Sequence, residues 1–429
     1  MKQFNELSLS QSIQVNLKRN CWIEPTAVQA QAIPRALTGA DVIASAQTGT
    51  GKTLAFLLPV IERLLTGPRA ERKASGLPPI RALVLSPTRE LAIQISDTFA
   101  KLSLNTGLRA AVAVGGLSEQ TQLNAIRRGA QLVIATPGRL EDFLDRQLVK
   151  LSAVEVLVLD EADRMLDMGF LPAIERILSV LPNERQSLFF SATMKKEVER
   201  LIARHSKDAV RIFVNGSNMA MPDQIDLHVY EVEDHVKLSL LRHMLGQNDG
   251  SFLVFARTKH GTDRLAKRLS RLGLPAVGMH GDRTQNQRNQ ALAGFRDGRY
   301  RILVATDVAA RGIHIDGVAH VVNYDLPQAP TDFIHRVGRT GRAGQRGAAS
   351  TFSMKSERGE VRRIELECKV SLERRTVAAE IVREANESAK ASIRSDSAAP
   401  NKHVHRSFHG RAGGKQNAGT RPKRGRRGL

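Results

Sequence analysis

The sequence predicts an α/β fold with two tandem parallel-sheet domains, followed by a disordered basic C-terminal tail. Short apolar runs with the length of buried strands alternate with longer helix-like stretches, which is typical of parallel sheets covered by helices. The alternation lapses into linker-like residues near 215–222 and then resumes. At 429 residues the chain is also too long for one ordinary domain, so the lapse is expected to separate two.

The expected strands follow one another in order along both halves. In the first half they are residues 42–45, 82–86, 111–114, 132–135, 154–159, 187–190 and 211–214, with helices such as 90–102 and 172–181 between them. In the second half they are residues 227–232, 252–255, 302–305, 321–324 and 348–352. We therefore expect a first domain at residues 1–215, a linker at 216–223 and a second domain at 224–378.

The remaining residues, 379–429, are expected to form a largely disordered tail. Residues 401–429 hold nine Lys or Arg and no Asp or Glu. Such a segment cannot bury enough apolar surface to fold alone. Its histidines, His403, His405 and His409, are more typical of an incidental cluster than of a metal site, because no cysteine accompanies them.

Net charge and cysteine usage narrow the class of protein. The formal charge of +21 favours a polyanionic partner, either nucleic acid or an anionic membrane. No apolar run approaches membrane-spanning length, and the N-terminus lacks the apolar core of a signal peptide, so we expect a cytoplasmic protein without a membrane partner. Cys21 and Cys368 are too few for a disulfide framework or a four-cysteine metal site.

A glycine-rich segment follows the first strand and opens the next helix. A strand, a turn of this kind ending in Lys-Thr and a helix form a phosphate-binding loop, because backbone N–H groups and the helix N-terminus hold phosphate oxygens. Lys52 would reach the β- and γ-phosphates of a nucleoside triphosphate, and the Thr53 hydroxyl would bind Mg²⁺. Ala46 stands where the general pattern has Gly, and a glycine-containing turn with an incidental Lys-Thr is the alternative. The predicted loop is Ala46, Gln47, Thr48, Gly49, Thr50, Gly51, Lys52 and Thr53.

Two carboxylates follow the strand expected at residues 154–159. The carboxyl end of a buried parallel strand is where such sheets bind ligands. Asp160 would therefore hold Mg²⁺, and Glu161 would orient and deprotonate the attacking water. For this pair taken alone, an acidic and solvated turn is the alternative.

Asp160-Glu161-Ala162-Asp163 is the name-giving signature of the DEAD-box RNA helicases, and the chain resembles that family from residue 4 to about residue 350. The resemblance implies RecA-like domains, ATP and Mg²⁺ as cofactors, and single-stranded or duplex RNA as the partner. The basic tail and the compact core are most similar to the bacterial RhlE-type branch. We expect a monomer, and the resemblance suggests partner proteins of ribosome assembly or RNA decay.

The resemblance also assigns the adenine site and the coupling residues. Residues 25–29, with Trp22 before them and Phe4 upstream, resemble the Q motif. Gln29 would then read the adenine edge while an aromatic side chain such as Trp22 packs on the base. Ser191-Ala192-Thr193 resembles the motif that couples hydrolysis to strand separation, and we assign this coupling to Asp163, Ser191 and Thr193.

The motifs expected to contact RNA carry Thr, Arg and Gly rather than exposed aromatic residues. Hydroxyl, guanidinium and backbone N–H groups suit phosphates and 2′-hydroxyls, so the RNA backbone would be held with little base preference. Ordinary strand-end turn chemistry is the alternative for Thr88, Gly116 and Thr136. The predicted contacts are Thr88, Arg89, Gly116, Thr136, Arg139, Arg257, Arg288 and Thr306.

Phosphoryl transfer needs positive charge beside the γ-phosphate to stabilise its negative charge, and arginine fingers supply it. Arg339 and Arg342 are three residues apart and share one face of a helical turn, and the resemblance makes them the fingers. His335 and Arg336 would lie at the seam between the domains. The alternative for Arg336 is a contact with RNA phosphates.

The predicted function is RNA-stimulated ATP hydrolysis coupled to local RNA unwinding, with ATP and RNA both closing the two domains. An ATP-gated RNA clamp or annealing factor with little unwinding is the alternative, and a DNA translocase is another. One departure from the family pattern is His314, where the family has an Asp that contacts the ATP ribose. Histidine cannot accept hydrogen bonds as a carboxylate does, so weaker ATP binding is expected unless Asp316 compensates.

Overall fold

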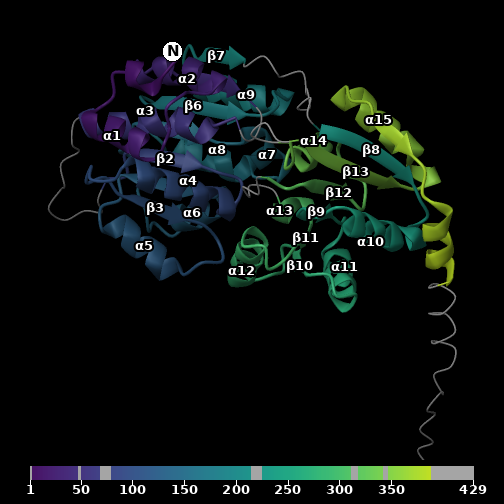
Figure 1. Ribbon diagram of the computed structural model, residues 1–429. Coiled ribbons are helices and arrows are strands. Elements are labelled where there is room, and N and C mark those ends of the chain that lie inside the picture. Colours follow the sequence, from purple (N-terminus) through teal and green to yellow (C-terminus); the bar gives the residue numbers. More distant parts are fainter. Residues whose placement is uncertain are drawn as a thin grey trace, which may run out of the picture.

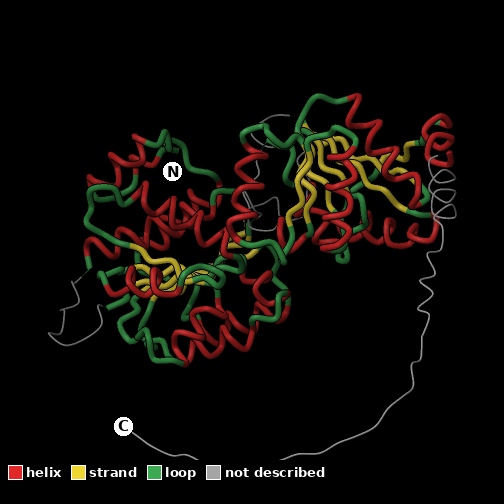
Figure 2. The backbone as a smooth tube through the Cα atoms, turned by 90° about the horizontal axis from the view of Figure 1, so that it is seen from below, coloured by secondary structure: helices red, strands yellow, loops and turns green. Residues whose placement is uncertain are grey.

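The computed structural model describes residues 2–46, 50–67, 79–213, 225–310, 317–341 and 346–387. These residues form two α/β halves, each built on one seven-stranded parallel sheet with helices on both faces (Figure 1 and Figure 2). The predicted α/β class with two tandem parallel sheets is confirmed. No helix in the described ranges has the length and apolar character that crossing a membrane would require.

The strands of the first half lie in the spatial order β3-β4-β2-β5-β6-β1-β7. They are β1 (Val42–Ser45), β2 (Ala82–Leu85), β3 (Ala110–Ala113), β4 (Leu132–Ala135), β5 (Val156–Leu159), β6 (Gln186–Ser191) and β7 (Val210–Phe213). The helices are η1 (Phe4–Glu6), α1 (Gln11–Arg19), α2 (Ala27–Leu37), α3 (Lys52–Thr66), α4 (Arg89–Leu102), α5 (Glu119–Arg127), α6 (Pro137–Asp145), α7 (Ala162–Asp167), α8 (Leu171–Ser179) and α9 (Lys196–His205).

The second half repeats the plan with the strand order β10-β11-β9-β12-β13-β8-β14. Its strands are β8 (Ile225–Glu231), β9 (Phe252–Phe255), β10 (Ala276–Met279), β11 (Ile302–Ala305), β12 (His320–Asn323), β13 (Gly347–Ser353) and β14 (Glu373–Arg375). Its helices are η2 (Asp234–Val236), α10 (Lys237–Gln247), α11 (Lys259–Arg271), α12 (Gln285–Arg296), α13 (Asp307–Ala310), α14 (Pro330–Val337), η3 (Lys355–Glu357) and α15 (Arg358–Cys368).

The central strands β2, β4, β5, β9 and β11 are apolar throughout because both of their faces are covered. In β5, Val156 and Val158 point into the core beneath α1–α4, while Leu157 and Leu159 point into the core beneath α5–α9. The second sheet is buried in the same way, with α10 and α11 on one face and α12–α15 on the other. Burial on both faces leaves the carboxyl edge of each sheet as the place where polar side chains gather.

The strand order divides the carboxyl edge of the first sheet between two groups of predicted residues. The strands β5, β6 and β1 are neighbours, so Asp160, Ser191 and the phosphate loop emerge side by side. The strands β2, β4 and β3 form the other side of that edge, and Thr88, Thr136 and Gly116 follow them. The predicted nucleotide residues and the predicted RNA residues therefore lie on adjacent stretches of one edge.

Two features differ from the expectations, and two expected segments fall on residues that the structure does not describe. The strands β10 and β14 were not expected; β10 is only Ala-Val-Gly-Met, and β14 is an exposed Glu-Arg-Arg at the sheet edge. Residues 379–387 form a helix rather than the start of a disordered tail, because Ile381 and Ala385 pack into the core beside α10. The expected linker at 216–223 and the tail from residue 388 onwards lie outside the described residues.

Candidate nucleotide and RNA site

The phosphate loop connects β1 to α3. Ala46 is buried and donates its N–H to the Ser191 carbonyl of the neighbouring strand (3.0 Å). Gly51 precedes α3 with φ of +86°, a conformation that requires glycine, and a Cβ here would also collide with the Gln29 amide. Lys52 begins α3 and is 7% exposed, with no hydrogen-bond partner for its Nζ among the described residues. Gln47, Thr48 and Gly49 lie outside the described residues.

Gln29 is hydrogen-bonded to the phosphate loop. Its Nε2 donates to the Gly51 carbonyl (2.9 Å), and its Oε1 accepts from the Thr26 N–H (2.8 Å) in the capping box of α2. The Thr26 hydroxyl donates to the Thr50 carbonyl (2.7 Å). Trp22 is partly buried and packs against the hydrophobic core beneath α1–α4. The start of α2 is therefore tied directly to the loop that would hold the phosphates.

Asp160 and Glu161 lie at the carboxyl end of β5 and are 2% and 6% exposed. Burial raises the pKa of Asp160 to about 7, although the positive charge of Lys52 opposes this shift. Burial also acts to raise the pKa of Glu161, but Arg164 and Lys52 outweigh it and lower that pKa to about 2. The Arg164 Nη1 donates to Glu161 Oε2 at 2.6 Å. Glu161 is therefore held as a carboxylate.

The donor set fits a divalent cation beside a phosphate. Asp160 Oδ1 is buried without a hydrogen-bond partner in the described part of the chain, and so is Lys52 Nζ. Buried polar atoms normally have partners, so these two atoms fit a bound cation and a bound anion. A hard oxygen ligand suits Mg²⁺, and an ammonium group suits phosphate. Thr53, next to Lys52 on α3, is partly buried.

Asp163, Ser191 and Thr193 form one hydrogen-bonded unit. The Asp163 carboxylate accepts from the backbone N–H (2.8 Å) and the hydroxyl (2.7 Å) of Thr193. The Ser191 hydroxyl accepts from the Asp163 N–H (3.3 Å) and donates to the Thr193 carbonyl (2.7 Å). The segment that follows β6 is thereby fixed to the helix that follows β5.

The second half presents α14 and the turn after it to this site. Burial lowers the pKa of His335 to about 4, Glu161 opposes the shift, and Arg164 adds to it, so His335 is neutral near pH 7 and lies close to both residues of the first half. Arg339 is 5% exposed and donates from Nε to the His335 carbonyl (3.3 Å). Arg342 lies outside the described residues.

Arg336 does not lie at the seam, which corrects the expectation for it. Its guanidinium makes a bidentate pair with Asp307 (2.6 and 2.7 Å) and also donates to the Asn323 side chain (3.2 Å) and the Asp325 carbonyl (2.7 Å). It packs over the Phe255 ring and is 2% exposed. The adjacent positions diverge because α14 is amphipathic, and consecutive helical residues point about 100° apart.

The predicted RNA contacts of the first half lie at the carboxyl edge of its sheet. Thr88 caps α4 by accepting the Leu91 N–H (3.3 Å), while Thr136 precedes α6 without a side-chain capping bond. The Arg89 guanidinium lies against Gly116, whose φ of +75° and lack of a Cβ permit that approach. Both readings of these residues, turn chemistry and RNA contact, are compatible with this arrangement.

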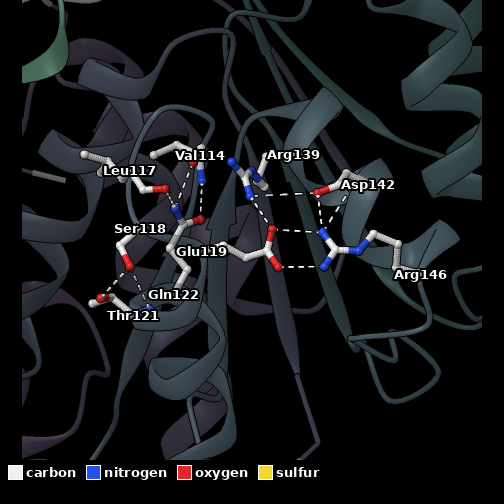
Figure 3. Close-up of polar contacts among 9 residues, drawn as sticks. All are labelled: Val114, Leu117, Ser118, Glu119, Thr121, Gln122, Arg139, Asp142 and Arg146. Atoms are coloured by element: carbon white, nitrogen blue, oxygen red, sulfur yellow. Dashed lines mark hydrogen bonds and ion pairs between the residues drawn. The ribbon is translucent and has the colours of Figure 1, made fainter. Parts of the chain in front are cut away.

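Figure 3 shows that Arg139 is one of two arginines held by Glu119. Glu119 accepts from Arg139 (3.1 Å) and from both terminal nitrogens of Arg146 (2.8 and 2.7 Å). In the same view Gln122 bonds both the N–H and the carbonyl of Val114 (2.9 Å each), which shapes the turn leading to Gly116. Neither Glu119 nor Gln122 was expected from the sequence, because both look like ordinary surface residues of a helix.

Two of the three predicted RNA contacts of the second half follow strands at the carboxyl edge of its own sheet, and the third lies on a helix. Arg257 is exposed after β9 and pairs with Glu357 (3.4 Å), and Thr306, 8% exposed, follows β11. Arg288 on α12 is buried and pairs with Glu90 of the first half (2.9 Å). Gln285 donates to the same carboxylate (3.1 Å). Glu90 thus joins the two halves, a role that a lone Glu in a helix-start motif did not suggest.

Comparison with known proteins places both halves in known families. Residues 26–201 match the family described as DEAD/DEAH box helicase, and residues 236–344 match the helicase conserved C-terminal domain. A relative named ATP-dependent RNA helicase CshA, from Limosilactobacillus reuteri, is 42% identical over 364 residues, which cover 85% of this chain and 71% of the relative.

Two solved structures are also similar over most of the chain. Dbp5 of S. cerevisiae bound to RNA and ADP BeF3 is 29% identical with a TM-score of 0.77, covering 91% of this chain and 99% of that one. A DEAD box protein from Methanococcus jannaschii is 36% identical with a TM-score of 0.51, covering 87% and 99%. By sequence and by structure, this chain belongs to the DEAD-box helicase family.

Proposed function

We propose that this chain is an ATP-dependent RNA helicase, which hydrolyses ATP when RNA is bound and separates short duplex regions with little base preference. The supporting observation is that both halves contribute to one buried polar site. Lys52, Asp160 and Glu161 come from the first half, and His335 and Arg339 come from the second. Family membership supplies the class of reaction. The proposed units are a RecA-like domain at residues 1–215 and another at 224–378.

ATP would lie on the loop between β1 and α3. Lys52 would bind the β- and γ-phosphates, and Gln29 would hold the adenine in register with them because its amide is already bonded to Gly51. Trp22 would pack near the base. Thr53 and Asp160 would hold Mg²⁺, which when bound neutralises charge on the phosphate oxygens.

Glu161 would accept a proton from the attacking water. It is ionised and its carboxylate is oriented by Arg164, so it can align the water before the bond to the γ-phosphate breaks. Arg339 and Arg342 would stabilise the charge that develops on the transferred group, and a neutral His335 would link them to Glu161 and Asp163.

RNA would lie along the predicted contacts of both carboxyl edges. Thr88, Arg89, Gly116, Thr136 and Arg139 would hold the backbone on the first half. Arg257, Arg288 and Thr306 would do so on the second, which requires Arg288 to exchange Glu90 for phosphate. The Asp163–Thr193 bonds would pass the change at the γ-phosphate to the segment after β6.

Parallel assays of ATP hydrolysis and duplex unwinding test this function. The wild-type chain should hydrolyse ATP faster with RNA than with DNA and should separate a short RNA duplex. Glu161→Gln should bind ATP and RNA and release RNA slowly. Absence of RNA-stimulated hydrolysis would refute the proposal, and hydrolysis without unwinding would favour an ATP-gated clamp instead.

The narrower assignments are also proposals. The named relative is CshA, whereas the compact core and basic tail favour the RhlE-type branch. We propose a cytoplasmic monomer that works with proteins of ribosome assembly or RNA decay. Sequencing of RNAs crosslinked to Glu161→Gln would identify its substrates. His314, whose effect on ATP affinity we also propose, lies outside the described residues.

A further inference from the structure

A row of arginines lies on α11, away from the nucleotide site. Arg264, Arg268 and Arg271 follow the spacing i, i+4, i+7, which places them on one face over about 10 Å of helix. All three are exposed. Within the described residues none of their guanidinium groups has a hydrogen bond or ion pair. Lys259 on the same helix, by contrast, has an acidic partner, Asp282.

These arginines line a cavity of about 680 Å³ between α10 and α11. Arg242 of α10 lies on its opposite wall, and Tyr324 after β12 contributes to the lining. Burial raises the pKa of Tyr324, and Arg268 and Arg264 oppose the shift, which places both guanidinium groups near the phenol. We call this cavity with its arginine row the α11 groove.

The two carboxylates that line the α11 groove share one cationic partner, so together with it they leave a single negative charge against the three arginines. Asp325 is 3.3 Å and Asp234 is 3.6 Å from the Nζ of Lys237, and Arg242 is paired with Glu384. The arginine row therefore gives the groove a net positive charge. An extended anion with regularly spaced charges would complement it.

The groove is continuous with the edge proposed to hold RNA. It begins at Ala256 and Thr258, on either side of the proposed RNA contact Arg257, at the carboxyl end of β9. From there α11 leads away from that edge to Arg271, as Figure 1 shows. Ala385 lines the groove on its other side, and the chain then continues into residues 401–429 with their nine Lys or Arg.

We propose that the α11 groove binds the phosphodiester backbone of the same RNA strand where it leaves the two carboxyl edges. Guanidinium groups bind phosphate in a bidentate manner, and a row of them suits successive phosphates rather than one compact anion. The groove extends the contact to nucleotides beyond the two carboxyl edges and binds them without sequence preference, because it contacts phosphates and not bases. This inference rests on the proposed RNA helicase function.

RNA length tests the proposal. The groove variant is Arg264→Gln, Arg268→Gln and Arg271→Gln combined. Its matched control is Lys267→Gln, Arg299→Gln and Arg362→Gln, which removes the same charge from exposed positions outside the groove. Binding is measured against salt for the shortest single-stranded RNA that fully stimulates wild-type hydrolysis, and for that RNA extended at one end or the other.

The groove variant should bind the short RNA like the wild type and lose about tenfold or more in affinity for one of the two extended RNAs. For that RNA the slope of log affinity against log salt should flatten by about two, since each single-strand phosphate contact contributes about 0.7. The control should change affinity only slightly for every RNA. Equal behaviour of the two variants, or an equal loss of affinity with short and extended RNA, would contradict the proposal that the α11 groove binds RNA. Wild-type hydrolysis that RNA does not stimulate would instead refute the proposed function.

Discussion

At the scale of single residues, the ion pair between Glu161 and Arg164 decides the state of the proposed base. Both are buried, and Glu161 adopts a left-handed backbone with φ of +53°, which non-glycine residues rarely use. Two nitrogens of Arg164, Nε and Nη2, have no partner among the described residues. Strain and unsatisfied donors at one position are typical of functional sites, where the local geometry serves chemistry rather than stability.

The arginine finger is tested by Arg339→Ala. ATP binding should stay within a fewfold of the wild type, because Lys52 and the loop remain, while RNA-stimulated turnover should fall by about 10³-fold or more. Arg362→Ala, an exposed arginine of the same half, is the control and should leave turnover unchanged. Nucleotide titration and steady-state hydrolysis measure the two effects, and normal turnover in Arg339→Ala would remove the finger assignment.

At the scale of elements, helices position side chains that pair across the fold. Glu119 begins α5 and holds Arg139 and Arg146 from α6 and its C-terminal end (Figure 3). The same carboxylate therefore competes with RNA phosphate for a proposed RNA contact. Hydrogen bonds from Arg146 and the charge of both arginines outweigh burial and lower the pKa of Glu119.

Glu119→Gln should strengthen RNA binding. Freed guanidinium groups gain up to one or two phosphate contacts, so the slope of log affinity against log salt should steepen by about 0.7 to 1.4. Stability should change by less than about 1 kcal/mol, since the pairs with Arg146 are exposed. Glu141→Gln, on the other side of α6, is a suitable control. An unchanged slope would show that these arginines do not reach RNA.

His320 gives the second half a dependence on pH. It is buried in β12, bonds the Ser350 hydroxyl of β13 (2.9 Å) and stacks on Phe252. Burial lowers its pKa to about 4, from 6.5 in the unfolded chain. The unfolded chain then binds more protons, so stability is intact above pH 6.5 and is lost by roughly 1.4 kcal/mol per pH unit between 6.5 and 4.

His320→Gln should flatten that dependence while keeping a polar partner for Ser350. The comparison is denaturant unfolding of the wild type and the variant at pH 7 and pH 5. The wild type should lose about 2 kcal/mol more than the variant over this interval. Equal losses would show that His320 becomes protonated without unfolding.

The sequence could predict most elements, and the misses have physical reasons. Strands buried on both faces, such as β5, are continuous apolar runs that stand out. The edge strand β14 is polar and exposed, so its identity depends on pairing with β8. The helix at 379–387 is short and is stabilised by packing on α10, which local sequence does not reveal.

The site was predictable where one motif supplies both geometry and chemistry. The phosphate loop and Asp160 lie where their strands end, as expected. Arg336 was misplaced because neighbouring positions of α14 face opposite environments. Glu90 was missed because its partner Arg288 lies far along the chain, in the other half. Contacts between halves depend on orientation, which no local pattern encodes.

At the scale of the whole molecule, the seam between the halves is polar. Glu90 accepts from Gln285 and Arg288, and His335 approaches Glu161, Asp163 and Arg164. An interface with polar contacts opens and closes more readily than one held by apolar packing. The chain can then alternate between two arrangements that ATP and RNA bias.

Glu90→Gln should weaken the closed arrangement without touching the nucleotide. It removes a buried ion pair at 2.9 Å while leaving Arg288 free to meet RNA. The RNA concentration for half-maximal stimulation should change severalfold, and energy transfer between probes on the two halves should report a smaller closed fraction without ligands. Glu175→Gln, which removes an exposed pair with Arg204 inside the first half, is the control. Unchanged energy transfer would show that Glu90 does not hold the seam.

The most direct measurement of the central claim is the coupling between ATP and RNA in Glu161→Gln, which should bind both without hydrolysis. If both ligands bind across one closing seam, ATP must raise RNA affinity by the same factor that RNA raises ATP affinity, about 5- to 150-fold. Titrations of each ligand, with and without saturating amounts of the other, give both factors. Two equal factors in that range are the predicted result. RNA affinity that is the same with and without ATP would contradict the account.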